Sequence, residues 1–164
     1  MSGVYSSLPE KVWNHGFEPI SEKEAFTIFT CRYEQILHDV YHWFLESQNL
    51  PTIAVRFDFK DVSSEHAYFW ADKKMLVVNV RAIMTAYGDE EYLTYVMLET
   101  FFHELFHYWQ SVNYGLPKMK ALNLMFNGGA YWLYQRNPLE IEARSFATSA
   151  VKQYLAKFGE DTDL

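Results

Sequence analysis

The chain has 164 residues, 49% of them hydrophobic, and a formal net charge of −7. This length fits a single domain over residues 1–164, and the hydrophobic content excludes a disordered chain. The negative charge argues against a nucleic-acid partner, because a surface that contacts phosphates needs an excess of lysine and arginine.

The cysteine count and the hydropathy pattern favour a reducing compartment. Cys31 is the only cysteine, so no disulfide can form within the chain. The N-terminal residues lack a basic segment followed by an apolar stretch, and no run of about 18 apolar residues occurs anywhere. We therefore expect a cytoplasmic protein without a membrane segment.

The first half of the chain is expected to contain an irregular arm, a long helix and three strands. Residues 1–20 carry scattered glycine and proline without periodicity, which predicts the arm. A capping box at Ser21–Glu24 opens an amphipathic helix that ends near Leu50. Three short runs rich in β-branched and aromatic residues follow, at 53–59, 67–70 and 75–80.

The next helix is expected to begin at Asp89 and to end before Gly115. It contains an H-E-x-x-H motif made of His103, Glu104 and His107. Two histidines four residues apart share one helix face, so both imidazoles can reach one Zn²⁺ at about 2.0–2.1 Å. Glu104 lies about 100° around the helix from the first histidine, where it can reach a water on the ion without binding the ion. The motif predicts a hydrolytic zinc site with Glu104 as general base.

A third ligand is expected on the last helix, which runs from Pro138 to about Phe158. Glu140 and Glu142 both lie near its start. Asn137 as N-cap, Pro138 at N1 and Glu140 at N3 also form a capping box, in which Glu140 would bind a backbone N–H instead. The two glutamates point about 200° apart around the helix, so they cannot share the ligand role. The residues alone leave both open.

The H-E-x-x-H motif followed by E-x-E-A-x-x-F-A, from Glu140 to Ala147, resembles the gluzincin metallopeptidases. The likeness covers Thr100 to Ala147 and is closest to the compact soluble ImmA/IrrE group, while the CAAX-prenyl endopeptidases share the motifs but are membrane proteins. The resemblance implies that Glu140 is the metal ligand, with Glu142 as the alternative, and that the activity is endopeptidase rather than exopeptidase. Arg144 departs from the pattern, because these families usually place Asp or Asn there to support the site. An arginine could pair with Glu140 instead.

The expected fold is α+β, a minimal zincin-like domain. Its small antiparallel sheet packs on the long N-terminal helix, the H-E-x-x-H helix and the C-terminal third-ligand helix. By resemblance, the strand Met75–Val80 would be the sheet edge that receives an extended substrate, and Asn79 would contact that substrate. The alternative for Asn79 is a polar residue on the solvent face of a strand.

The predicted function is that of a zinc-dependent metallopeptidase with one Zn²⁺, a protein or peptide substrate and no membrane partner. The alternative is a non-proteolytic zinc-containing domain that binds or regulates proteins and keeps the gluzincin fold. Fe(II) or Mn²⁺ could occupy the same ligands. A second histidine pair, His38 and His42, is interpreted as part of a polar helix face. The sequence does not choose among the residues that could stabilise an oxyanion, which are Tyr108, Tyr131, Tyr134 and Arg136.

Overall fold

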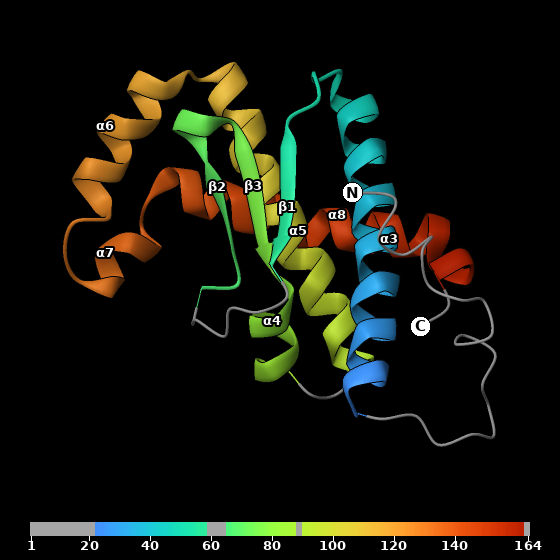
Figure 1. Ribbon diagram of the computed structural model, residues 1–164. Coiled ribbons are helices and arrows are strands. Elements are labelled where there is room, and N and C mark those ends of the chain that lie inside the picture. The colour runs from blue at the N-terminus through green and yellow to red at the C-terminus, as the bar shows by residue number, and fades with distance from the viewer. Residues whose placement is uncertain (1–21, 59–64, 88–89, 163–164) are drawn as a thin grey trace.

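The computed structural model describes residues 22–58, 65–87 and 90–162 (Figure 1). The expected arm over residues 1–20 lies outside them. The helices are α3 (Glu22–Gln48), α4 (Val80–Ala86), α5 (Glu90–Asn113), α6 (Leu116–Phe126), α7 (Tyr131–Gln135) and α8 (Pro138–Thr162). The strands are β1 (Ala54–Asp58), β2 (Ala67–Trp70) and β3 (Met75–Asn79). The described chain is mostly helical with one small sheet, which confirms the α+β class.

The sheet differs from the predicted one in direction and in order. Its strand order is β1-β3-β2, with β1 parallel and β2 antiparallel to β3. The sheet is therefore mixed, and the prediction that Met75–Val80 forms an edge strand is wrong. The physical reason is burial, since Leu76, Val77 and Val78 are all 0% exposed. A strand buried on both faces takes the centre of a sheet, and the edges are β1 and β2.

Helix α5 is held in the core by aromatic side chains from both neighbouring helices. Phe102 is fully buried, and the ring of Trp43 from α3 meets it edge-on at 5.9 Å between centroids. Phe106 stacks on Phe146 of α8 at 4.6 Å and 21°. Burying one such side chain contributes about 1.5–3 kcal/mol, so α5 is fixed firmly between α3 and α8. Among the described side chains, most aromatic residues belong to the core or pack against it, and they give the H-E-x-x-H motif a rigid support.

Helices α6 and α7 form an arm beside the sheet, on the side of β2 (Figure 1). The sequence predicted only a connecting segment here. Gly115 reverses the chain after α5 with a φ of +86°, a conformation that disfavours any side chain. Pro117 then lies in the first turn of α6, where its missing N–H costs no hydrogen bond. The same two residues that end α5 therefore start α6.

Candidate metal centre

His103, His107 and Glu140 converge where the first turn of α8 meets α5. The two histidines project from one face of α5, and their Nε2 atoms are 3.2 Å apart. Glu140 places Oε2 at 2.8 Å from His103 Nε2 and Oε1 at 3.1 Å from His107 Nε2. A tetrahedral zinc site separates its ligand atoms by roughly 3.3 Å, given metal–ligand bonds of about 2.0–2.1 Å. These three residues fit one metal ion, and no other group of three metal-ligating side chains gathers in this way within the described residues.

The cap of α8 is formed by the side chain of Asn137, and no hydrogen bond of Glu140 contributes to it. Asn137 Oδ1 accepts the backbone N–H of Leu139 at 3.0 Å, so Asn137 caps α8 by itself. The carboxylate of Glu140 turns to the two histidines instead. Asn137 is fully buried, and its Nδ2 donates to Asn123 Oδ1 at 3.0 Å and to Asn127 Oδ1 at 2.9 Å. These bonds tie the first turn of α8 to the end of α6.

Glu142 and Arg144 lie away from the three converging side chains. Glu142 Oε1 accepts hydrogen bonds from Gln110 Nε2 at 3.0 Å and from the Tyr114 hydroxyl at 2.8 Å. Arg144 is exposed, and its Nη2 donates to the Gln135 carbonyl at 2.8 Å. The expected pairing of this arginine with Glu140 is replaced by that backbone contact.

The ionisable side chains of the site shift one another's pKa values. Burial alone would raise the pKa of Glu140, but hydrogen bonds from His103 and His107 outweigh it and hold that pKa well below its usual range. Burial would lower the pKa of His107, and its hydrogen bond to Glu140 and the charge of Glu104 reverse this and raise it. Burial also raises the pKa of Glu104. The charges of the two histidines and a hydrogen bond from the Phe69 backbone offset part of this rise. A carboxylate whose pKa is raised is suited to taking up and returning a proton.

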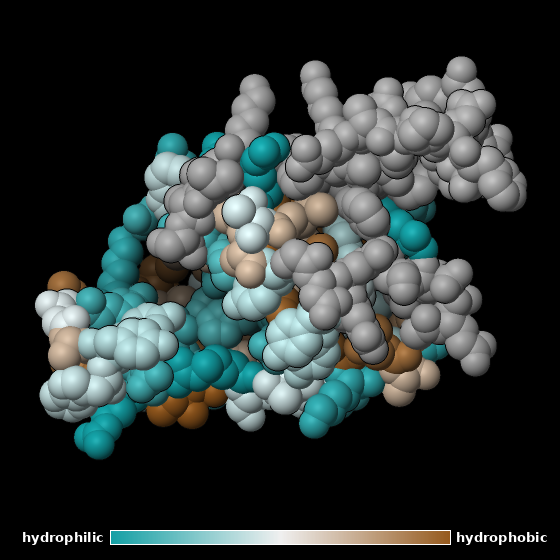
Figure 2. Space-filling view, turned by 90° about the horizontal axis from the view of Figure 1, so that it is seen from below, coloured by the Kyte–Doolittle hydropathy of each residue, from teal (hydrophilic) through white to brown (hydrophobic). Residues whose placement is uncertain are grey.

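Two hollows open onto the site from different sides. One, of about 380 Å³, lies between β2, α6 and the site residues Glu104, His107 and Glu140. The other, of about 240 Å³, is bounded by His66, Glu99 and Thr100 and reaches His103 and Glu104. Figure 2 shows the α6–α7 arm at the left, separated from the body of the molecule by a hollow with hydrophilic residues around it. At the margin of the larger hollow, Lys120 of α6 pairs with Asp72 of the turn after β2 at 2.9 Å.

Asn79, the predicted substrate contact, has an internal partner. It is 3% exposed, and its Nδ2 donates to the Glu65 carbonyl at 2.7 Å. Its backbone N–H donates to the His66 carbonyl at 2.8 Å. Asn79 thus holds the segment that leads into β2, and the solvent-face alternative does not apply to so buried a side chain.

Of the four candidates for oxyanion stabilisation, Tyr134 is the one that lines the larger hollow. Its hydroxyl is hydrogen-bonded to the Glu140 carboxylate, and burial together with that negative charge raises its pKa. Tyr108 donates its hydroxyl to the Pro51 carbonyl at 2.6 Å. Tyr131 is 72% exposed, and the guanidinium of Arg136 lies over the ring of Trp132.

Sequence reasoning missed Gln110, which is 0% exposed and contacts the site directly. Its Oε1 lies 2.8 Å from Nδ1 of His107. The available signal was a polar residue one turn after the second histidine, on the helix face that carries both histidines. That signal does not identify its other partners, because two of the three lie on α8.

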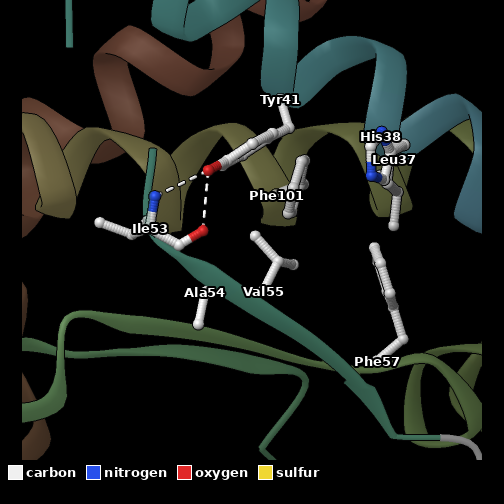
Figure 3. A pocket seen from close by; sticks show the side chains of 8 residues that line it. All are labelled: Leu37, His38, Tyr41, Ile53, Ala54, Val55, Phe57 and Phe101. Atoms are coloured by element: carbon white, nitrogen blue, oxygen red, sulfur yellow. Dashed lines mark hydrogen bonds between the residues drawn. The ribbon is translucent and has the colours of Figure 1, made fainter. Parts of the chain in front are cut away.

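A separate hollow between α3 and β1 lacks this chemistry (Figure 3). Its lining is mainly apolar, and at one end the Tyr41 hydroxyl bridges the backbone N–H and carbonyl of Ile53, both at 2.8 Å. His38 lines it, and its ring lies 4.7 Å from that of the exposed His42. The two histidines have no carboxylate or thiol third ligand among the described side chains.

No protein-family model matches this chain, and neither a curated protein nor a solved structure does. Within the part of the chain that the structure describes, no helix combines the length and the apolar character needed to cross a bilayer.

Proposed function

We propose that this protein is a zinc-dependent metallopeptidase with a gluzincin-like site in a minimal zincin-like domain, in which His103, His107 and Glu140 hold one Zn²⁺. The observation that carries the proposal is the convergence of two imidazole nitrogens and one carboxylate within 3.2 Å, beside a cleft. Two imidazoles and one carboxylate with an open fourth position are a ligand set typical of hydrolytic zinc. A structural zinc site would be closed by a fourth side chain, and the described residues supply only three.

Glu104 is the general base in this proposal. It lines both hollows next to the ligands, and its raised pKa makes the carboxylate a better proton acceptor. When bound, the ion supplies Lewis acidity, which lowers the pKa of a water and polarises the carbonyl of the scissile bond. The Glu104 carboxylate takes the proton of the attacking water and then gives it to the leaving nitrogen. The Tyr134 hydroxyl turns from the Glu140 carboxylate and donates its hydrogen bond to the oxygen that becomes negative as the water attacks.

The substrate in this proposal is an extended polypeptide that pairs with β2. This strand is a sheet edge, and Ala67, Tyr68 and Phe69 line the larger hollow. Added strands gain main-chain hydrogen bonds at such an edge. Because hollows open on both sides of Glu104, a chain can continue past the site in both directions. This arrangement supports endopeptidase action over removal of terminal residues.

The decisive experiment compares the wild type with Glu104→Gln. The variant should keep stoichiometric zinc by elemental analysis but lose cleavage of a peptide library, because the amide cannot take the proton. Glu46→Gln, on an exposed position of α3, is the matched control and should cleave at the wild-type rate. Wild-type turnover by a zinc-loaded Glu104→Gln would refute the mechanism. A folded, zinc-loaded wild type that cleaves no peptide, with or without chelator, would favour a non-proteolytic binding domain.

A second pair of variants tests the ligand assignment and the metal. Glu140→Gln removes the anionic ligand and should weaken zinc affinity strongly, whereas Glu142→Gln should change it much less because Glu142 contacts Gln110 and Tyr114. The reverse order of effects would transfer the ligand role to Glu142. Stoichiometric iron or manganese in protein purified without added metal would contradict the choice of zinc.

A further inference from the structure

A chain of hydrogen bonds runs from His107 through the buried Gln110 and Glu142 of α8 to Tyr114, the residue after α5. His107 Nδ1 lies 2.8 Å from Gln110 Oε1. Gln110 Nε2 donates to the Leu139 carbonyl and to Glu142 Oε1, both at 3.0 Å. The Tyr114 hydroxyl donates to both oxygens of Glu142 at 2.8 and 2.9 Å. Apart from His107, none of these groups belongs to the three proposed ligands.

The two acceptors on α8 decide which way the Gln110 amide points. Its NH₂ group faces a backbone carbonyl and a carboxylate, and neither can donate a hydrogen bond. The reversed amide would direct its oxygen at those two acceptors, with two lone-pair repulsions at a fully buried residue. The amide oxygen is therefore left to face His107, and it requires a proton on Nδ1 of the ring.

We propose that Gln110 is a positioning residue that fixes the tautomer and the orientation of His107, with Glu142 and the Leu139 carbonyl fixing Gln110 in turn. A neutral imidazole with its proton on Nδ1 carries its lone pair on Nε2, the atom that faces His103 and Glu140. Leu139 directly precedes Glu140, so the same amide joins the helix of one ligand to the helix of another. This inference deepens the proposed metal site and rests on it.

The test measures zinc binding rather than cleavage. The dissociation constant of the full-length metal-free protein for Zn²⁺ is determined by competition with a chromogenic chelator. The zinc-loaded protein is then studied by ¹H–¹⁵N NMR for a slowly exchanging Nδ1–H of His107. Gln110→Leu should weaken zinc binding about 10–100-fold and lose that signal. Asn113→Leu, an exposed amide later on the same helix, is the control and should leave both unchanged.

If Gln110→Leu does not fold, the inference is tested by exchanging the amide of Gln110 and the carboxylate of Glu142. Gln110→Glu still offers an acceptor to His107 but sets a second carboxylate against Glu142, so zinc binding should weaken. Adding Glu142→Gln restores a donor to that carboxylate and should recover part of the lost affinity, while the Leu139 carbonyl stays without its donor. A double variant no tighter than Gln110→Glu, or a folded Gln110→Leu with wild-type affinity and an intact Nδ1–H signal, overturns the inference.

The failure of this inference can be distinguished from the failure of the proposed function. Normal zinc binding with the expected variant effects but no peptide cleavage would refute the peptidase and leave the role of Gln110 intact. Normal peptide cleavage, together with unchanged zinc binding in the Gln110 variants, would refute the role of Gln110 and leave the peptidase intact. A wild type that binds no divalent ion would overturn both.

Discussion

Replacing Asn137 should destabilise the metal-free protein more than the loss of an ordinary helix cap. An N-cap contributes about 1 kcal/mol. Asn137 also donates two hydrogen bonds to Asn123 and Asn127 while fully buried, and each such bond contributes about 0.5–1.5 kcal/mol. Asn137→Ala should therefore lower the free energy of unfolding by about 2–4 kcal/mol. Asn137→Ser keeps a capping oxygen but lacks the amide donors, so it should lose about 1 kcal/mol less than Asn137→Ala.

Urea denaturation in the presence of chelator, followed by circular dichroism, gives these free energies without a contribution from bound metal. Asn113→Ala, at an exposed position, is the control and should stay within about 0.5 kcal/mol of the wild type. A loss below about 0.5 kcal/mol for Asn137→Ala would refute the reasoning. So would equal losses for the alanine and serine variants, because the capping oxygen would then contribute nothing. The zinc affinity of both variants should also fall, since Glu140 follows Asn137 by three residues.

Three other perturbations follow from the site and the core. The pKa of His107 is raised to about 9 in the metal-free protein, so the ring is protonated at neutral pH and zinc must displace that proton. Zinc affinity should hence rise from about pH 7 to about pH 9, with proton release seen by calorimetry in buffers of different ionisation enthalpy; a flat profile would contradict the pairing. Tyr134→Phe should lower kcat for peptide cleavage by about 10²–10³-fold with zinc content unchanged, and an unaltered kcat would exclude this hydroxyl from the reaction. Phe102→Ala should cost about 3–5 kcal/mol of unfolding free energy in urea, and a cost below about 1 kcal/mol would show that the core is not centred on this ring.

The elements that the sequence predicted well are those with a long, regular pattern. Helices α3, α5 and α8 lie where capping residues and helical periodicity placed them, and the three strands lie at the three β-rich runs. The strand order was missed because the resemblance, rather than burial, was used to choose the edge. Consecutive Leu76, Val77 and Val78 indicate a strand covered on both faces, and that pattern was available in the sequence. Pro117 could also have indicated the start of α6, because proline is frequent in the first turn of a helix.

The sequence likewise predicts only part of the candidate site. His103, Glu104 and His107 belong to one helix, so local spacing predicts their geometry. The choice between Glu140 and Glu142 depends on how α8 packs on α5, and no spacing encodes that rotation. Gln110 depends on the same contact, because two of its three partners lie on α8. Tertiary packing therefore decides whatever the motif leaves open.

The bond between Tyr41 and Ile53 makes the two edges of the sheet unequal. Its hydroxyl occupies both backbone hydrogen-bonding groups of Ile53, just before β1 begins (Figure 3). Another polypeptide at that edge cannot form hydrogen bonds with the N–H and carbonyl of Ile53, because the Tyr41 hydroxyl already binds both. Self-association by edge-to-edge pairing needs two free edges per molecule if it is to extend into a fibre. Because the start of the β1 edge is occupied, pairing is favoured through β2 alone, and pairing through one edge favours a closed dimer over a fibre.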